Sequence, residues 1–398
     1  MDRRRFLGDA ASAVAAGLLP GVSALATQDR LPAGAVASAV LDALPGKRPL
    51  IKRSFRPPNY ETPLASLHEL YTPNDAFYVR WHMGVPDVAA ASWRLRVAGP
   101  AAKSAREFSL DELKRLPRHE VAAINQCSGN RRGLFQPHVT GVQWGYGAMG
   151  NARWAGARLK DVLEAAGIAP QAVEVAADGA DAPTLTGPDF VKSLPMWKAL
   201  DPDTLVAYEM NEAPLPRWHG APARLVVPGW TATYWVKSVT LLTVLDQPFA
   251  GFWMKSAYRV PKGIFGPSRF ESQENEQTAP ITDIRVNSLI VTPEPGAAVA
   301  RDGHVEVHGF AWDGGSGVRK VECSTDGGAT WREAALGRDL GHYAWIPWRF
   351  ALAPPANGRR SLSVRATSRD GATQPDALVP NPAGYHHNIV QQAEFHAG

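Results

Sequence analysis

The chain has 398 residues, more than one ordinary domain needs, which suggests two or three domains. Hydrophobic residues make up 45% and charged residues 20%, a balance typical of a globular protein with a sizeable core. The net charge is only +4 with both signs mixed throughout, which argues against the concentrated basic surface of a nucleic-acid-binding protein. No window after the N-terminal segment offers the ~18 apolar residues of a membrane helix. We therefore expect neither a nucleic acid partner nor a membrane span.

Residues 1–26 have the pattern of a cleavable export signal, with an arginine-rich start, a weakly apolar middle and small residues at Ala24 and Ala26. The run from Arg3 to Leu7 resembles the twin-arginine signal of bacteria, although Asp2 stands where Ser or Thr is more usual. An ordinary secretory signal or a basic tail is the alternative. The twin-arginine route carries folded proteins, which suits a protein that receives a cofactor before export, and it predicts a periplasmic location.

The segments after residue 26 are predicted to form an N-terminal arm and then an α+β domain. Residues 27–59 are rich in Ala, Pro and basic residues, show no strong periodicity and are predicted to form an N-terminal arm. Residues 60–268 alternate short β-like runs with brief helical segments, which predicts an α+β domain with long loops. The predicted strands include FYVRWHM, WRLRVAG, RLVVPG and WVKSVTLLTV, and the predicted helices include SLDELKRL and RLKDVLEAAG.

The remainder of the chain predicts a second, purely β domain. A polar stretch at residues 269–285, which contains RFESQENEQTAP, interrupts the earlier pattern and predicts a linker. Residues 286–398 then hold short alternating runs such as HVEVHGFAW, with a hairpin turn predicted at Asp326 and Gly327. About a hundred residues of such strands, with turns about every ten residues, predict an immunoglobulin-like sandwich.

Cys127 stands in a polar run, NQCSGNRRGLF, beside Arg131 and Arg132, and the other cysteine is Cys323, so that no disulfide framework is expected. A thiolate is both a nucleophile and a soft metal ligand, and neighbouring cations favour it. One interpretation is a buried, inert cysteine, which seldom has such polar neighbours. A nucleophile would need a histidine base, and a zinc site would need several Cys or His at short spacing, which the sequence lacks. One cysteine can also anchor a metal whose other ligands come from a cofactor.

Several motifs, taken in order, resemble the sulfite oxidase family of molybdenum enzymes. They are FYVRWHM, NQCSGNRRG, WGYGAMGNARWAGARLKDVL, AYEMNEAPLPRWHGAPARLVVPGW and WVKSV. The resemblance runs from residue 55 to near the C-terminus, and RPPNYETPL with the export signal makes the chain most similar to bacterial periplasmic sulfite dehydrogenases. It implies a molybdopterin-binding domain followed by an immunoglobulin-like dimerisation domain, and hence a homodimer.

The resemblance also implies roles for individual residues. Cys127 corresponds to the cysteine whose sulfur coordinates molybdenum, while the pterin and oxo groups supply the other ligands. Arg80 and Arg132 correspond to arginines of the substrate pocket, and Tyr208 to a tyrosine that faces the metal. The implied substrate is sulfite, an oxyanion that suits the fixed charge and forked donors of arginine. The positions that hold the pterin and its phosphate correspond to His82, Asp181, His219, Arg224 and Lys237.

The C-terminal segment departs from the pattern of this family. Many members carry a tryptophan-histidine-arginine run whose arginine reaches the substrate pocket. Here the segment reads NPAGYHHNIVQQ, with His386, His387 and Asn388. We therefore expect that the third cation is missing or is replaced by a titratable histidine, which would make substrate affinity pH-dependent.

The sequence also limits the path of the electrons. The CxxCH motif of covalent haem is absent, and two cysteines are too few for an iron–sulfur cluster. Molybdenum is then the expected redox centre, with no haem, and a separate c-type cytochrome is the expected electron acceptor, with oxygen as an alternative. Two other functions stay open, namely a sulfane dehydrogenase subunit of the same family and a cofactor-free periplasmic binding protein.

Overall fold

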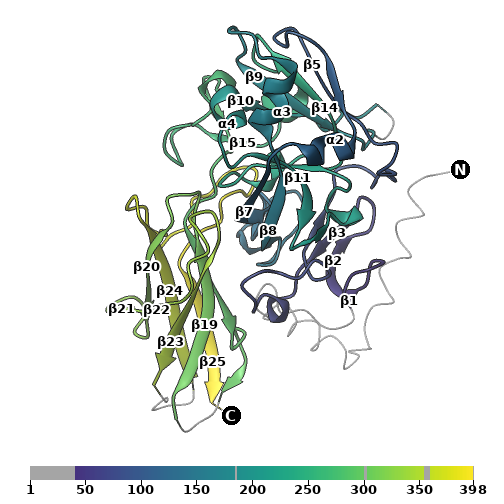
Figure 1. Ribbon diagram of the computed structural model, residues 1–398. Helices are drawn as coiled ribbons and strands as arrows, with labels where there is room; N and C mark the ends of the chain where they lie inside the picture. The colour runs from purple at the N-terminus through teal and green to yellow at the C-terminus, as the bar shows by residue number, and fades with distance from the viewer. Residues whose placement is uncertain (1–40, 184–185, 300–302, 354–358, 398) are drawn as a thin grey trace, which may run out of the picture. The chain divides into compact units, whose positions relative to one another are not determined.

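Figure 1 shows the computed structural model, which describes residues 41–183, 186–299, 303–353 and 359–397. The predicted export signal, residues 1–26, lies outside the described residues, as does the first part of the predicted arm. Strands and brief helices make up the described chain as far as residue 280, and strands alone follow from residue 287.

The first part is built from short strands that are antiparallel except where β14 pairs with β5. In order of neighbouring strands, one sheet contains β1 (Leu41–Asp42), β2 (Leu50–Ser54), β3 (Asn59–Glu61) and β4 (Val79–Arg80), and a second contains β10 (Lys192–Pro195), β9 (Glu174–Gly179), β14 (Val239–Leu245), β5 (Leu95–Ala98) and β6 (Arg106–Phe108). A third sheet contains β12 (Ala213–Pro214), β11 (Leu205–Met210), β8 (Met149–Arg158) and β7 (Arg118–Gln126), and β13 (Arg224–Val226) also pairs with β11. The last sheet consists of β15 (Arg259–Pro261) and β16 (Thr278–Pro280).

Short helices connect these strands. They are α2 (Leu110–Arg115), α3 (Leu159–Ala166), α4 (Met196–Ala199) and α5 (Phe252–Lys255), with 3-10 turns η2 (Leu64–Ser66), η3 (Arg132–Leu134), η4 (Arg217–His219), η5 (Ala232–Tyr234) and η6 (Glu271–Gln273). A capping box starts α2, because Ser109 and Glu112 each accept a hydrogen bond from the other's main-chain N–H. None of the helices in the described ranges has the length and apolar composition needed to cross a bilayer.

The longest strand pair positions the cysteine loop. β7 and β8 run antiparallel, from Arg118 opposite Ala157 to Gln126 opposite Met149. The buried indole of Trp154 on β8 donates to the carbonyl of Ala123 on β7 at 3.1 Å, which adds a side-chain bond to this ladder. Because β7 ends at Gln126, Cys127 is the first residue of the loop that follows.

The second part consists of two packed sheets. One contains β17 (Asn287–Thr292), β19 (Val305–Trp312), β23 (Ile346–Leu352) and β22 (Ala335–Leu336), and the other contains β18 (Ala298–Val299), β25 (Gln391–Ala397), β24 (Arg359–Ser368), β20 (Val318–Ser324) and β21 (Arg332–Glu333). Burial alternates along β23, as expected for a strand with one face in a core. Trp348, Val364 and Phe395 from the two sheets share that core. The predicted fold class, α+β followed by an all-β sandwich, is confirmed.

Two segments are more ordered than the sequence pattern indicates. Within the predicted arm, residues 27–59, β2 buries Leu50 and Ile51 and pairs on both sides. Within the predicted linker, residues 269–285, β16 pairs with β15 and the buried amide of Gln273 donates to the Glu174 carboxylate. Strands of two to five residues are too brief for a periodic pattern to show in the sequence.

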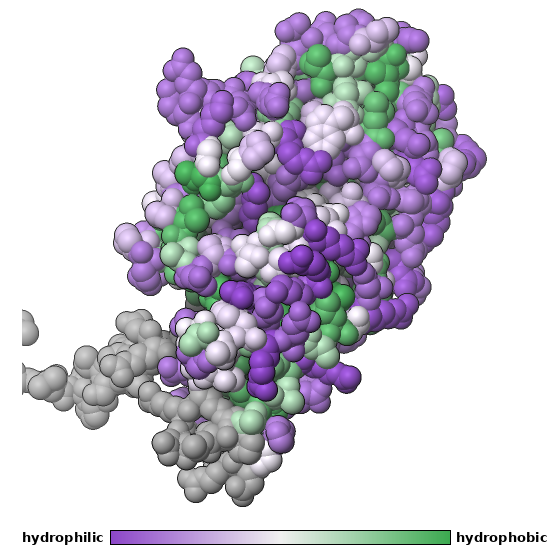
Figure 2. Space-filling model, turned by 90° about the vertical axis from the view of Figure 1, so that its left-hand side faces the viewer, coloured by the Kyte–Doolittle hydropathy of each residue, from purple (hydrophilic) through white to green (hydrophobic). Residues whose placement is uncertain are grey.

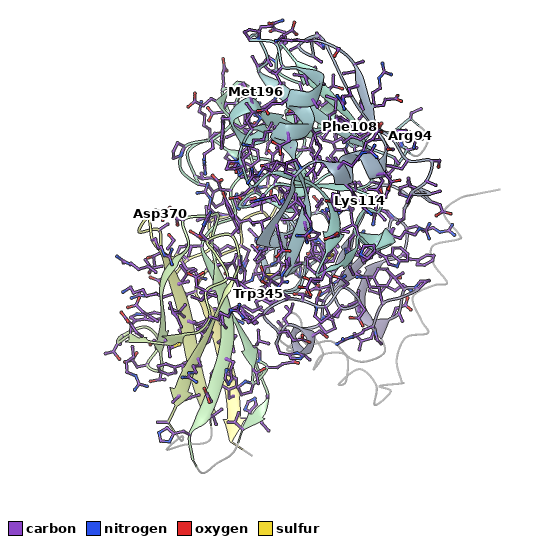
Figure 3. All side chains as sticks on the ribbon, in the orientation of Figure 1. Arg94, Phe108, Lys114, Met196, Trp345 and Asp370 are labelled. Carbon is purple, nitrogen blue, oxygen red and sulfur yellow. The ribbon has the colours of Figure 1, made fainter. Side chains whose placement is uncertain are left out.

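Buried hydrogen bonds join the two parts within one folded unit. The indole N–H of Trp345, labelled in Figure 3, donates to the carbonyl of Leu70 at 2.8 Å. The indole N–H of Trp312 donates to the side-chain oxygen of Gln126 at 2.7 Å, one residue before the cysteine loop. The outer face shown in Figure 2 is largely hydrophilic, with hydrophobic residues in separate small groups.

Candidate active site

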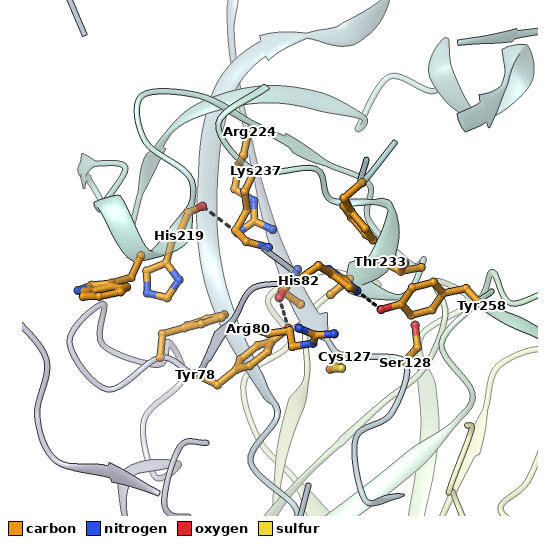
Figure 4. A pocket seen from close by; sticks show the side chains of 15 residues that line it. Tyr78, Arg80, His82, Cys127, Ser128, His219, Arg224, Thr233, Lys237 and Tyr258 are labelled. Carbon is orange, nitrogen blue, oxygen red and sulfur yellow. Dashed lines mark hydrogen bonds between the residues drawn. The ribbon is translucent and has the colours of Figure 1, made fainter. Parts of the chain in front are cut away.

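Two cavities meet at the cysteine loop, because Arg80, His82, Cys127 and Tyr258 line both of them. The inner cavity has a volume of about 30 Å³ and the outer cavity about 720 Å³. Residues that line only the inner cavity include Tyr78, Asn125, His219, Arg224, Thr233 and Lys237 (Figure 4). Residues that line only the outer cavity include Arg132, Gly141, Trp253, Lys255 and Tyr385.

Cys127 is held by the main chain of its loop. Its N–H donates to the carbonyl of Ala148 at 2.9 Å, and its carbonyl accepts from the N–H of Asn130 at 2.9 Å. The side-chain oxygen of Asn130 in turn accepts from the N–H of Ala148 at 3.0 Å. Cys127 is 8% exposed, and it lines both cavities. A fixed sulfur that faces a cavity suits a metal ligand better than a core cysteine.

The two arginines after Cys127 differ in role, because Arg131 is a buried structural residue and Arg132 lines the outer cavity. Arg131 is 1% exposed and donates to Asn287 Oδ1 and to the carbonyl of Ser288, both at 2.7 Å, so it ties the loop to β17 of the sandwich. Arg132 lines the outer cavity, and its Nε donates to the carbonyl of Ala383 at 2.9 Å. A Cβ at Gly129 would lie 2.6 Å from the Arg132 guanidinium, so this glycine makes room for the side chain.

Arg80 is the last residue of β4, and His82 lies two residues after it. Arg80 donates to Asn59 Oδ1 at 3.2 Å and to the carbonyl of Trp81. The His82 ring stacks on Phe190 at 3.8 Å, and its Nε2 is hydrogen-bonded to the hydroxyl of Tyr258 (Figure 4). Burial, and then the charge of Arg80, hold the pKa of His82 well below its usual range, so the ring is neutral.

Three further basic residues surround the inner cavity. Arg224 on β13 donates to the carbonyls of His219 and Trp235 at 3.0 and 2.9 Å, and burial lowers the pKa of Arg224 to about 10. Burial also lowers the pKa of Lys237 to about 7, with the charge of Arg224 as a second cause and Asp181 acting against it. For His219, burial holds the pKa well below its usual range. Such a set of basic side chains would be stabilised by an anionic ligand.

Family comparisons agree with this geometry. Residues 82–253 match the oxidoreductase molybdopterin binding domain, and residues 278–397 match the Mo-co oxidoreductase dimerisation domain. The chain is 37% identical over 369 residues to the sulfite oxidase of Gallus gallus, which covers 88% of this chain and 79% of that protein. It is 34% identical over 315 residues to the sulfite oxidase of Arabidopsis thaliana, which covers 75% of this chain and 78% of that protein.

The chain belongs to the sulfite oxidase family.

One similar sulfite oxidase extends well beyond this chain, and one solved structure matches nearly all of the fold. The mitochondrial sulfite oxidase of Drosophila melanogaster is 38% identical over 335 residues, and the match covers 80% of this chain but only 57% of that protein. Among solved structures, the sulfane dehydrogenase SoxCD from Paracoccus pantotrophus superposes with a TM-score of 0.74 at 26% identity. That match covers 97% of this chain and 92% of the solved chain, so it includes both parts of the fold.

The cavity residues fit the molybdopterin that the sulfite oxidase family implies. Asn125 Nδ2, Ser128 Oγ and Thr233 Oγ1 are buried without a hydrogen-bond partner in the described part of the chain, and all three residues line the inner cavity. A buried donor left unpaired costs about 1–3 kcal/mol, so this cluster favours a polar ligand that supplies acceptors. The inner cavity alone is too small for such a ligand, and the outer cavity adds volume in the range of ligand sites.

The structure brings most of the predicted sulfite oxidase residues to this site. Arg80, His82 and Cys127 line both cavities, Arg132 lines the outer one, and His219, Arg224 and Lys237 line the inner one. Asp181 is buried behind the lining, where its carboxylate and the Lys237 ammonium influence each other's pKa.

Tyr208 requires a correction, because the structure does not bring it to either cavity. Its ring centre lies 5.7 Å from Nζ of Lys114 on α2, which is labelled in Figure 3, and the charges of Glu209 and Arg118 act on it. Ala207 pairs with Arg224, whose side chain faces the inner cavity. The β11–β8 register shifts between Ala207 and Glu209, so Tyr208 sits at an irregularity of the strand, and it is absent from the lining of both cavities.

The sequence interpretation missed two tyrosines of the site. Tyr258 lines both cavities, and Tyr385 of the C-terminal segment lines the outer one. Their rings stack 5.8 Å apart, and Tyr385 lies 5.2 Å from the Arg132 guanidinium. Tyr258 stands outside the motifs quoted above, and Tyr385 lies in the C-terminal segment NPAGYHHNIVQQ, where only the residues after it were considered.

The two histidines after Tyr385 do not replace the absent arginine. His386 packs on Phe265, and His387 packs on Phe135. Burial holds the pKa of His386 well below its usual range and lowers the pKa of His387 to about 3, so both rings are neutral. Neither is among the residues that line the inner or outer cavity. The expected pH-dependent histidine cation is therefore not supported.

Proposed function

We propose that this protein oxidises sulfite to sulfate at a molybdenum–pterin centre whose metal is bound by Cys127. In the overall reaction, sulfite and water give sulfate, two protons and two electrons. The metal, when bound, supplies the two-electron oxidation and the transfer of an oxygen atom that comes from water. The observation that carries the proposal is that Arg80, Arg132 and Cys127 line one cavity.

The charges around the outer cavity suit a small oxyanion. Arginine stays protonated at any pH at which sulfite is a substrate, and its planar fork matches the oxygens of an oxyanion. His82 adds a neutral ring rather than a cation, because burial depresses its pKa. Arg80 and Arg132 are therefore proposed to bind and orient sulfite beside Cys127.

Tyr258 is proposed to take the role that the resemblance assigned to Tyr208. Burial raises the pKa of Tyr258, so its hydroxyl keeps its proton and can donate one hydrogen bond. Its partner in this structure is Nε2 of His82, and an oxyanion in the outer cavity is the proposed acceptor when substrate binds. The pair can thus hold or move a proton next to the substrate.

We further propose that electrons leave singly to an external c-type cytochrome, that the protein is periplasmic after twin-arginine export, and that it forms a homodimer. The lack of a CxxCH motif supports an external acceptor, and the arginine-rich start at Arg3 to Leu7 supports the route. The match of residues 278–397 to a dimerisation domain supports the dimer.

The test uses protein purified after expression with its signal intact. Metal analysis should find molybdenum, and sulfite should reduce added cytochrome c in the absence of oxygen, with two cytochromes reduced per sulfate formed. Rapid sulfate production with oxygen and stoichiometric hydrogen peroxide, without cytochrome, would favour an oxidase. Protein that never contains molybdenum would refute the enzyme assignment and favour a binding protein.

A sulfane dehydrogenase activity is the second candidate, favoured by the size of the outer cavity. Its volume of about 720 Å³ is far larger than a four-atom oxyanion needs, and the C-terminal segment contributes Tyr385 rather than an arginine to its lining. The SoxCD structure matches nearly the whole chain. Parallel assays with sulfite and with protein-bound sulfane sulfur at equal molybdenum content would separate the two activities.

A further inference from the structure

Lys47 lies behind the inner cavity, in the loop between β1 and β2. It is 9% exposed although it belongs to the predicted arm. Its ammonium nitrogen lies 2.6 Å from the carbonyl oxygen of Asn74, 2.7 Å from that of Phe77 and 2.5 Å from Nε2 of His219. Phe77 and His219 line the inner cavity. A residue far upstream in the sequence is thus bonded to the wall of the site.

The three contacts determine which nitrogen of His219 carries the proton. A lysine ammonium has three N–H donors and no acceptor, and here each donor has one acceptor. Two of the acceptors are carbonyl oxygens, so while Lys47 is protonated the third, Nε2 of His219, accepts as well. A neutral imidazole with Nε2 as acceptor carries its proton on Nδ1.

The rest of the His219 environment keeps the ring in place. Its ring meets that of Phe77 edge-on at 5.2 Å, and its carbonyl accepts from Arg224 at 3.0 Å. Burial, and then the charge of Lys47, hold the pKa of His219 well below its usual range, so the ring is neutral. With Nε2 bonded to Lys47, Nδ1 is the ring nitrogen left to serve a ligand.

We propose that Lys47 is a positioning residue for the cofactor site. It fixes His219 in the Nδ1–H tautomer, so that the ring offers a donor to an acceptor oxygen or nitrogen of the pterin, and it ties the β1–β2 hairpin to the site. The tautomer follows from the contacts of Lys47 in its charged form. The consequence for cofactor retention also rests on the proposed molybdenum–pterin function.

The first experiment measures the tautomer directly. The full chain is labelled with 15N-histidine, the ring signals of His219 are identified by their loss in His219→Gln, and spectra are recorded at pH 6, where a pKa of about 7 leaves Lys47 charged. The wild type should show a protonated Nδ1 and an unprotonated Nε2. Lys47→Met should move the proton toward Nε2, and Lys47→Arg should restore the wild-type pattern. A wild-type proton on Nε2 would overturn the proposal.

The second experiment measures retention of the cofactor by molybdenum and pterin analysis over time. Lys47→Met should lose the cofactor roughly tenfold faster than the wild type, as expected for one charge-assisted hydrogen bond, and Lys47→Arg should recover part of the loss. Lys52→Met is the matched control, because Lys52 is an exposed residue of β2 that pairs with Asp42. Equal loss from both methionine variants would refute the role in retention.

The two experiments test the tautomer of His219 and the proposed molybdenum–pterin function separately. A wild-type protein without pterin would refute the proposed function, while the spectra would still establish or reject the tautomer. If Lys47→Met does not fold, the wild-type spectrum and Lys47→Arg still decide the proposal. In Lys47→Arg, the wild-type tautomer with at least partial recovery of retention supports the proposal. A changed tautomer with wild-type retention contradicts it, as does the wild-type tautomer without any recovery.

Discussion

The hydroxyl of Tyr258 is hydrogen-bonded to Nε2 of His82, and the two residues lie on the border between the inner and outer cavities. Tyr258 has a φ of 57°, in the left-handed region that a bulky residue avoids. Such a backbone costs about 1–3 kcal/mol and persists only where the surrounding structure holds it. The contacts around Tyr258 therefore hold its phenol at the site despite this cost, whereas Tyr208 on β11 lines neither cavity.

The first prediction compares these two tyrosines. Tyr258→Phe keeps the ring but removes the donor, so kcat for sulfite should fall about tenfold to a hundredfold with molybdenum content unchanged. Tyr208→Phe should leave kcat at the wild-type value, because that ring lies under Lys114. Steady-state kinetics normalised to molybdenum check both. The opposite ranking would restore Tyr208 as the functional tyrosine.

The second prediction concerns Lys192, which is buried behind Tyr258. Its Nζ donates to the carbonyl of Trp253 at 2.7 Å and lies 5.2 Å from the centre of the Tyr258 ring. Lys192→Met should release both contacts and lower kcat about tenfold with little change in KM. Lys198→Met removes another buried lysine, paired with Asp201, and should lower only stability. Equal kcat values in the two variants would contradict a positioning role for Lys192.

The third prediction separates the neighbouring arginines. Arg132→Gln should lower kcat/KM about tenfold to a hundredfold, mainly through KM, because a cation at the outer cavity is lost. Arg131→Gln should leave KM unchanged and lower the free energy of unfolding by about 2 kcal/mol, because the bonds to Asn287 and Ser288 are lost. Kinetics and denaturant unfolding of both variants test this. A raised KM in Arg131→Gln alone would reverse the assignments.

The fourth prediction separates the two cysteines. Cys127→Ser should lose molybdenum and sulfite oxidation with the melting temperature of the cofactor-free protein unchanged. Cys323 lies in the sandwich core, where burial raises its pKa to about 12 and keeps the thiol neutral. Cys323→Ala should keep molybdenum and activity but lower stability by about 1 kcal/mol. A fully active serine variant at position 127 would disprove the metal-ligand assignment.

The fifth prediction follows from the pKa of Lys47 and of Lys237, which burial lowers from 10.5 to about 7 in the protein without its cofactor. Between pH 7 and 10 the unfolded chain keeps these protons and the folded chain releases them, so the free energy of unfolding should rise with pH. The slope should reach at most about 1.4 kcal/mol per pH unit for each lysine. Denaturant unfolding at pH 7, 8 and 9 checks this, and Lys237→Met should reduce the slope. A flat profile would mean that both lysines stay charged when buried.

The sequence alone predicted the parts of the site that lie in contiguous motifs. The loop after β7 holds Cys127 and Arg132 close together in sequence, and Arg80 and His82 share one short run, so their proximity in the fold is local. Tyr208 lies in β11 and lines neither cavity, and the motif around it does not indicate where each side chain points. The register shift of β11 at Tyr208 is a property of the sheet that no local pattern predicts.

Residues that reach the site through tertiary contacts could not be predicted from the sequence. Lys47 stands 172 positions from His219, and nothing in its neighbourhood distinguishes it from a surface lysine. Tyr385 comes from the strand-rich second part, and its approach to Tyr258 depends on how that part packs on the first. The strands of the second part were easier to predict, because turn residues and alternating runs are local features.

The contact of Arg132 with the carbonyl of Ala383 has a consequence for biosynthesis. The wall of the outer cavity combines Arg80 from the first part of the chain with Tyr385 from the second part. During synthesis Arg80 emerges long before Tyr385, so this wall stays open to solvent until the sandwich has formed. A metal cofactor would therefore be enclosed only after the two parts have folded against each other.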